Sequence, residues 1–236
     1  MLRTQPTGTH MKIFIDTANV DEITKYADLG IIDGVTTNPA LMATEQRTAI
    51  DIIHEIVKIV DGPISVEVVS TEAGRMVAEA RHLASLHENI VVKLPAIPAG
   101  FEALNVVIRE GIKVNFTMIY TANQALLAAK LGATYVSPFV GRLDVTSTGG
   151  AELIEEIVTI FDNYGFEAQV LAASMRNSIY VKYAALAGAH AATIPPVVLK
   201  AMIESEMSQI SLDGFLEQWE TLPEASKASL FDGVEE

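Results

Sequence analysis

Short apolar runs alternate along this chain with longer stretches in which apolar residues recur at helical spacing. In the run Ile90–Val92, consecutive β-branched residues are typical of a strand buried on both faces. In the stretch 49–60, apolar residues occupy one face of a helix, which Gly62 and Pro63 end. This alternation predicts strand–helix units whose parallel strands lie beneath a layer of helices.

Eight such units follow one another, with strands predicted at residues 12–17, 34–38, 64–69, 90–95, 113–119, 135–140, 168–173 and 191–194. The connections have the short lengths expected of βα units. Eight units in about 200 residues predict an α/β protein with a single (β/α)8 TIM barrel. An open, doubly wound sheet is the alternative, although no glycine-rich phosphate loop follows the first strand.

An extra C-terminal helix is predicted beyond the barrel, because Leu212, Phe215, Leu216 and Trp219 share one apolar stripe. Such a stripe requires a covering surface. The sequence leaves open whether its own barrel or a neighbouring subunit provides that surface.

Both ends of the chain are expected to lie outside the barrel domain. Residues 1–10 have the character of an expression leader and lack the apolar stretch of a signal peptide. Residues 223–236 are small and acidic and are expected to form a flexible tail. The barrel with its C-terminal helix is therefore predicted to span residues 11–222.

Composition narrows the possible partners. The formal net charge of −14 argues against nucleic acid and anionic membranes, and an anionic substrate would need a local basic pocket. The chain has no cysteine, and its histidines show no ligand-like pairing, so neither disulfides nor a metal site are expected. No apolar run reaches membrane-spanning length, and we expect a cytoplasmic protein.

Lys93 interrupts the apolar strand at 90–95. Burial lowers the pKa of a lysine, whereas nearby carboxylates raise it, and the sequence does not decide which effect is larger. A neutral lysine amine attacks a carbonyl and forms a Schiff base. An isolated lysine at a strand end could equally extend to water, so the surrounding polar residues have to distinguish the two interpretations.

Polar residues stand near the carboxyl end of nearly every predicted strand, which is where barrels of this kind form their active sites. These residues are Asp16, Asn38, Glu67, Asn115, Thr117, Ser137 and Ser174, with Arg142 and Arg176 in adjoining loops. Each alone has an ordinary explanation, such as a helix cap or a surface ion pair. Together, at one end of one barrel, they predict an active site around Lys93.

The residue types suit imine chemistry on a sugar. An iminium on Lys93 withdraws electrons from the adjacent carbon–carbon bond, and Asp16 can take the proton of the neighbouring hydroxyl. Glu67, acting through a water held by Thr117, can move the protons needed to form and hydrolyse the imine.

The remaining polar residues suit recognition of a phosphorylated sugar. Asn38 and Asn115 match the hydroxyls of the sugar. Arg142, Ser174 and Arg176 offer two cations and a hydroxyl to a terminal phosphate.

The segments that carry these residues are FIDTAN, GVTTNP, SVEVVS, VVKLP, YVSPFVGRLD and LAASMRN. Together they resemble the short, single-domain transaldolases of the transaldolase/fructose-6-phosphate aldolase family, from Lys12 to about Trp219. The resemblance implies that Lys93 is the Schiff-base lysine and that Asp16 is the acid/base at carbon–carbon cleavage. It also implies that Glu67 and Thr117 hold the catalytic water, and that the phosphate ligands are Arg142, Ser174 and Arg176.

The resemblance favours a transaldolase of the pentose phosphate pathway that needs no cofactor. It would transfer a dihydroxyacetone unit from sedoheptulose 7-phosphate or fructose 6-phosphate to glyceraldehyde 3-phosphate or erythrose 4-phosphate. Short members of the family are homo-oligomers built from rings, so a pentamer or decamer is expected, with the C-terminal helix on a neighbouring subunit.

Three different functions are also compatible with the sequence. A fructose-6-phosphate aldolase would release free dihydroxyacetone; against it, Glu67 stands where aldolases have Gln, and Phe139 stands where they have Tyr. Asn115 and Arg176 also match the transaldolases. A pyridoxal-phosphate enzyme would likewise use a barrel lysine and a phosphate site, and a sugar-phosphate binder without catalysis would use the arginines alone.

Overall fold

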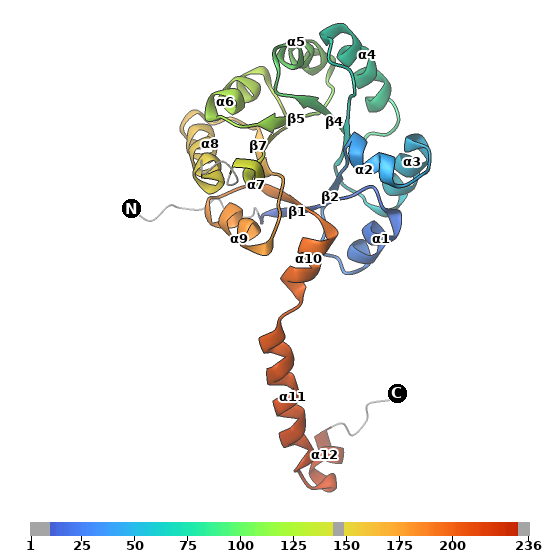
Figure 1. The fold of residues 1–236 in the computed structure, drawn as a ribbon, viewed down its shortest axis with the longest axis vertical. Coiled ribbons are helices and arrows are strands. Elements are labelled where there is room, and N and C mark those ends of the chain that lie inside the picture. Colours follow the sequence, from blue (N-terminus) through green and yellow to red (C-terminus); the bar gives the residue numbers. More distant parts are fainter. Residues whose placement is uncertain (1–9, 144–148, 231–236) are drawn as a thin grey trace. The chain divides into compact units, whose positions relative to one another are not determined.

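Parallel strands β1 to β8 close into a barrel in the computed structural model, which describes residues 10–143 and 149–230 (Figure 1). Each strand pairs with the next one along the chain, and β8 (Ala191–Ile194) pairs with β1 (Lys12–Asp16). The remaining strands are β2 (Gly34–Thr36), β3 (Ile64–Glu67), β4 (Ile90–Pro95), β5 (Val114–Ile119), β6 (Tyr135–Pro138) and β7 (Gln169–Ala172). The predicted TIM barrel is confirmed, and the open sheet is excluded.

Helices surround this barrel (Figure 1). They are α1 (Val20–Asp28), α2 (Pro39–Thr44), α3 (Ala49–Ile59), α4 (Ala73–Ala84), α5 (Pro98–Val107), the 3-10 turn η1 (Ile108–Glu110), α6 (Ala122–Leu131), α7 (Val140–Leu143), α8 (Gly150–Tyr164), α9 (Ser178–Leu186) and α10 (Pro196–Ile203).

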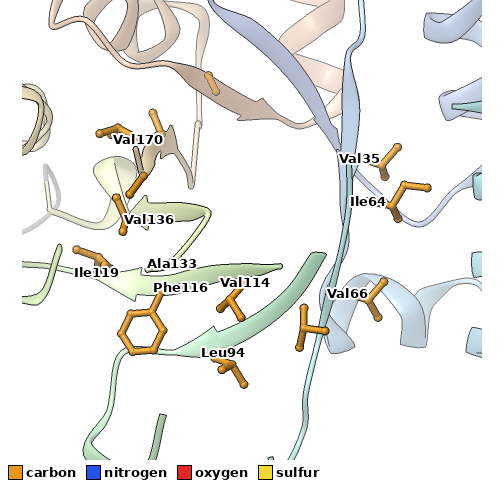
Figure 2. Close-up of a cluster of buried hydrophobic side chains, with 14 of the residues drawn as sticks. Val35, Ile64, Val66, Leu94, Val114, Phe116, Ile119, Ala133, Val136 and Val170 are labelled. Atoms are coloured by element: carbon orange, nitrogen blue, oxygen red, sulfur yellow. The ribbon is translucent and has the colours of Figure 1, made fainter. Parts of the chain in front are cut away.

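Two apolar layers hold the barrel together. Outward-facing strand residues, such as Val92, Leu94 and Phe116, pack with the helices in one continuous core (Figure 2). A separate cluster of inward-facing side chains fills the barrel interior; we call it the inner cluster, and it consists of Phe14, Val91, Tyr135, Leu171 and Ala191. Because the strands carry apolar residues on both faces, they appear in the sequence as continuous apolar runs.

The helices α2, α7 and α10 were not predicted. Pro39 begins α2, and the side chain of Asn38 caps it by accepting a hydrogen bond from the Leu41 amide. This arrangement uses the proline at a helix start, where its missing N–H does no harm. The predicted strand 135–140 is also too long, because β6 stops at Pro138 and Val140 begins α7.

The chain divides into two compact units, and the second begins at Lys200. It contains α11 (Glu206–Glu220), which Ser205 caps, and α12 (Glu224–Leu230). Three residues of the predicted apolar stripe of α11 are exposed, namely Leu212, Phe215 and Leu216, whereas Trp219 is half-buried. The surface that would cover the stripe stays a prediction. In the part of the chain that the structure describes, no helix is long and apolar enough to cross a membrane.

Residues 224–230 of the expected flexible tail form the helix α12; the flexibility of the tail stays a prediction. In α12, the ammonium of Lys227 contacts the carboxylates of Glu220 at 2.8 Å and Glu224 at 3.0 Å. The contact with Glu220 joins α12 to the end of α11, and the contact with Glu224 lies within α12. The remaining tail residues, and residues 1–9 of the predicted leader at 1–10, lie outside the described residues.

Candidate active site

A cavity of about 170 Å³ lies at the carboxyl ends of the strands. Its wall contains Asp16, Thr36, Asn38, Lys93, Asn115, Thr117, Ser137, Phe139, Ala173, Ser174 and Thr193. Eight of these residues belong to the site predicted from the sequence, while Thr36, Ala173 and Thr193 do not. The barrel therefore brings most of the predicted residues to one cavity.

The alternation of the strands explains how the cavity is positioned. Successive residues of a strand point to opposite faces, so residues two apart share a face. Each member of the inner cluster is followed, two residues later in the sequence, by a residue of the cavity wall. These wall residues are Asp16, Lys93, Ser137, Ala173 and Thr193. The inward face of the barrel is thus apolar below and mostly polar at the strand ends.

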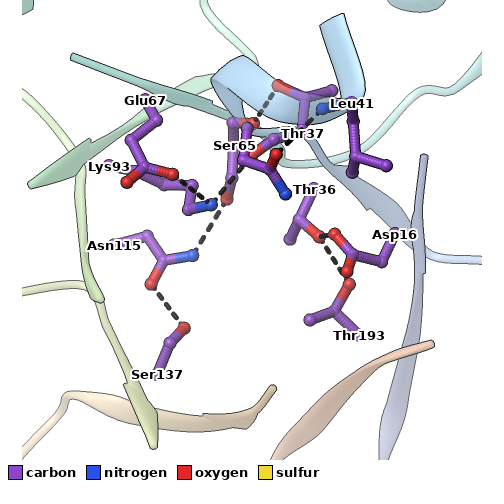
Figure 3. Close-up of polar contacts among 11 residues, drawn as sticks. Asp16, Thr36, Thr37, Leu41, Ser65, Glu67, Lys93, Asn115, Ser137 and Thr193 are labelled. Atoms are coloured by element: carbon purple, nitrogen blue, oxygen red, sulfur yellow. Dashed lines mark hydrogen bonds and ion pairs between the residues drawn. The ribbon is translucent and has the colours of Figure 1, made fainter. Parts of the chain in front are cut away.

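Lys93 is held in a buried ion pair. Its Nζ lies 2.8 Å from Oε2 of Glu67, and the two side chains are 8% and 6% exposed (Figure 3). The same Nζ donates a hydrogen bond of 2.8 Å to the carbonyl of Thr37. The pairing of β3 with β4 places Glu67 directly beside Lys93. The nucleophile candidate therefore touches a carboxylate that can exchange a proton with it.

Asp16 receives a hydrogen bond from the neighbouring strand. Thr36 Oγ1 donates to Asp16 Oδ1 at 2.7 Å, and it lies 2.5 Å from Thr193 Oγ1. Burial raises the pKa of Asp16; the hydrogen bond from Thr36 and the charge of Lys93 oppose this, and the charge of Glu67 adds to it. The net result is a raised pKa, so this carboxylate is a stronger base than an ordinary aspartate.

Asn115 is oriented by hydrogen bonds on both of its amide atoms. Ser137 Oγ donates to Asn115 Oδ1 at 2.6 Å, and Asn115 Nδ2 donates to Ser65 Oγ at 3.2 Å (Figure 3). All three residues are buried. A buried amide with both ends engaged presents a fixed pattern of donors and acceptors to a ligand.

Ser174 reaches the cavity through an unusual backbone conformation. Its φ is 62°, in the left-handed region that side chains other than glycine rarely adopt. This breaks the alternation of the chain after β7, so both Ala173 and Ser174 line the cavity and Met175 turns into the outer core. The strain is therefore associated with a position at the candidate site.

Gly141 allows the backbone of α7 to lie close to Ser174 and Arg176. A Cβ on Gly141 would lie 2.2 Å from the carbonyl oxygen of Ser174 and 3.0 Å from Cγ of Arg176, which is too close for any side chain. Arg176 is exposed at this place. Arg142 lies in α7 next to Gly141, and its side chain is outside the described part of the structure.

Phe139 contributes an apolar ring to the cavity wall. Its ring meets that of Tyr120 at a centroid distance of 5.9 Å and an angle of 67°. Tyr120 itself does not line the cavity. The wall therefore presents a ring without a hydroxyl at this point.

Sequence reasoning missed Thr36 and Thr193. A usable signal existed for Thr36, because it stands two residues before Asn38 and shares its strand face. Thr193 is the polar residue of β8. Within the described residues, no group of three or more His, Asp or Glu side chains could hold a metal ion.

Comparison with known proteins identifies close relatives. Residues 13–232 match the sequence model of the transaldolase/fructose-6-phosphate aldolase family. A probable transaldolase of Thermoanaerobacter sp. (strain X514) is 54% identical over 209 residues, which cover 89% of this chain and 97% of the relative. A probable transaldolase of Geobacter sulfurreducens is 54% identical over 213 residues, which cover 90% of this chain and all of the relative.

Solved structures with similar folds are more distant in sequence. A native KDPGal structure matches with a TM-score of 0.54 and 16% identity, covering 80% of this chain and 84% of that chain. The carboxyl transferase domain of Rhizobium etli pyruvate carboxylase matches with a TM-score of 0.62 and 10% identity, covering 80% of this chain and 40% of that chain. At these identities the likeness concerns the barrel alone.

Proposed function

This chain belongs to the transaldolase/fructose-6-phosphate aldolase family, and on that premise we propose that it acts as a transaldolase. It transfers a dihydroxyacetone unit from sedoheptulose 7-phosphate or fructose 6-phosphate to glyceraldehyde 3-phosphate or erythrose 4-phosphate. The observation that carries the proposal is the buried pair of Lys93 and Glu67, set beside a cavity that Asp16 also lines. The proposal includes a cytoplasmic homo-oligomer, a pentamer or decamer, that serves the pentose phosphate pathway.

Imine formation begins with the Lys93–Glu67 pair. Glu67 takes a proton from the Lys93 ammonium, with which it is in contact at 2.8 Å. The neutral amine then adds to the ketone carbon of the donor sugar. The resulting carbinolamine loses its hydroxyl as water, with the proton supplied by Glu67, directly or through a water held by Thr117. Hydrolysis of the imine reverses these steps.

Cleavage uses the second carboxylate. Asp16 takes the proton of the hydroxyl on C4 of fructose 6-phosphate, and the C3–C4 bond breaks to give an aldehyde. The bond electrons move into the iminium and leave an enamine on Lys93. An acceptor aldehyde then adds to this enamine while Asp16 returns the proton to the new hydroxyl.

The hydroxyls of the bound unit are matched by fixed polar groups. Asn115, held by Ser65 and Ser137, offers an oriented amide to the cavity. Asn38 lines the same cavity while its Oδ1 caps α2, so its NH₂ group is the part suited to donate to the substrate.

The proposal is tested by incubating the protein with fructose 6-phosphate in the presence and absence of erythrose 4-phosphate. We expect rapid turnover only when the acceptor is present. If fructose 6-phosphate alone is split at the same rate, the protein is an aldolase and the transferase assignment is wrong.

Phe139→Tyr should increase the release of free dihydroxyacetone by about tenfold or more, because a phenolic hydroxyl in the wall can activate the water that hydrolyses the imine. Free dihydroxyacetone is measured with fructose 6-phosphate as the sole substrate. Tyr120→Phe is the matched control, since this ring contacts Phe139 without lining the cavity. Unchanged release in Phe139→Tyr would contradict the role given to the hydroxyl-free ring.

Arg142→Ala and Arg176→Ala should each raise the KM for phosphorylated acceptors, because each removes a charge-assisted contact worth about 1.5–3 kcal/mol. The KM for unphosphorylated glyceraldehyde should change little. Arg109→Ala removes an exposed arginine that contacts Asn105 and serves as the control. Equal losses with both kinds of acceptor would show that the two arginines act structurally.

A further inference from the structure

We propose that Thr193 is a positioning residue for catalysis, and that its hydroxyl holds the proton of Thr36 on the carboxylate of Asp16. This inference rests on the proposed function, in which Asp16 is the base at cleavage. Thr193 does not contact the reacting atoms in this scheme. It acts through Thr36.

The three side chains come from adjacent strands across the point where the barrel closes. Asp16 on β1 pairs with Thr36 on β2, and Thr193 pairs with Phe14 on the other side of β1. Thr36 and Thr193 are only 2% and 4% exposed. Figure 3 shows Thr36 with its contacts to Asp16 and Thr193. Two buried hydroxyls in contact here depend on each other for their hydrogen bonds.

Proton counting gives the hydrogen bonds a direction. A threonine hydroxyl has one proton to donate and can accept with its lone pairs. Thr36 donates its proton to Asp16 Oδ1 at 2.7 Å. The contact of 2.5 Å between Thr36 Oγ1 and Thr193 Oγ1 must therefore use the proton of Thr193. The result is a chain from Thr193 to Thr36 to Asp16, in which each bond polarises the next.

The linked hydrogen bonds from Thr193 to Thr36 to Asp16 give the two carboxylate oxygens of Asp16 different roles. Oδ1 accepts from Thr36, so Oδ2 is the oxygen that takes the proton of the substrate hydroxyl. Without Thr193, the hydroxyl of Thr36 loses the donor that orients it. Thr36 then donates less strongly to Asp16, and Oδ1 and Oδ2 are no longer distinguished as firmly.

Loss of the Thr193 hydroxyl should be measurable in a pH profile, because it changes the pKa of Asp16. The charged groups that act on it are Lys93 on β4, which favours the carboxylate, and Glu67 on β3, which disfavours it. Burial raises the pKa of Asp16, and the hydrogen bond from Thr36 lowers it. Weakening that bond moves the pKa further upward. The carboxylate form is then lost at a higher pH as the solution is acidified.

The test compares Thr193→Val and Thr193→Ala, which remove the hydroxyl, with Thr193→Ser, which keeps it. Both removals should lower the rate of donor cleavage by about two- to tenfold, the usual worth of one hydrogen bond. They should also move the acidic limb of the pH profile of kcat/KM to higher pH. Thr193→Ser should restore the wild-type profile. Thr134→Val is the matched control, since it removes a hydroxyl that accepts from the Val114 amide before β6 begins.

Trapping with borohydride separates this proposal from the proposed function. Imine formation on Lys93 should be unchanged in all Thr193 variants, because it depends on Glu67. Wild-type protein that traps no adduct would refute the Schiff-base function itself. A trapped wild-type adduct together with an unshifted pH profile in both removal variants would overturn the role of Thr193 alone. Equal losses in Thr193→Ser and Thr193→Val would also overturn it, since they would indicate a packing role.

Discussion

Replacing Lys93 with arginine should abolish turnover, with an expected loss of more than about four orders of magnitude. An arginine keeps a positive charge beside Glu67, so the buried carboxylate stays paired and the barrel is expected to fold. Its guanidinium remains protonated and cannot form an imine. Lys93→Ala is a less clear test, because it leaves Glu67 buried without its partner.

Chemical trapping locates the nucleophile directly. After incubation with fructose 6-phosphate and borohydride, the peptide that contains Lys93 should gain a reduced three-carbon unit, measured by mass spectrometry. Lys113→Arg is the control, because Lys113 is an exposed lysine that donates to the carbonyl of Glu88. An adduct on another lysine, or turnover that persists in Lys93→Arg, would refute the assignment.

Asp16→Asn should slow carbon–carbon cleavage by about two to four orders of magnitude, the usual worth of a positioned general base. An amide can still accept the hydrogen bond from Thr36, but it cannot take a proton from the substrate. Imine formation should continue, so borohydride should now trap the intact six-carbon sugar phosphate on Lys93. The mass of the adduct therefore reports which step has failed.

The pH profile gives a second measurement of the same role. In the wild type, activity should rise with pH as Asp16 ionises, and burial places this rise above the range of an ordinary aspartate. Asp16→Asn should lose that rise.

Glu67→Ala should instead slow the formation and hydrolysis of the imine. If the two variants share one defect, the division of labour between the carboxylates is wrong.

The sequence predicts the fold well where local and global signals agree. The bounds of β4 (Ile90–Pro95) and β8 (Ala191–Ile194) match the predicted strands, because both are apolar runs that end at or just before a proline. Prediction fails at α2, α7 and α10, which begin within a few residues of a strand end. Such short helices lack the repeated apolar spacing that identifies longer ones.

The site was predictable only in part, for a physical reason. Lys93 and Asp16 stand out because charged groups in apolar strands need an explanation. The contact between Thr36 and Thr193 depends on the closure of β8 on β1. This closure joins distant segments of the sequence, so no local pattern encodes it. The left-handed backbone of Ser174 is likewise opposed by local preference and is maintained by the packing around it.

In the proposed reaction, the inner cluster limits the route by which substrates enter and leave the site. It fills the barrel beneath the cavity, so within the described residues the site opens toward the carboxyl ends of the strands. In the proposed reaction, the aldehyde formed by cleavage has to leave through the opening by which the acceptor enters. The two aldehydes therefore take turns at a single enzyme-bound unit, which is the condition for ping-pong kinetics. Because the inner cluster fills the barrel below the cavity, the first aldehyde has to leave before the second can bind in the proposed reaction.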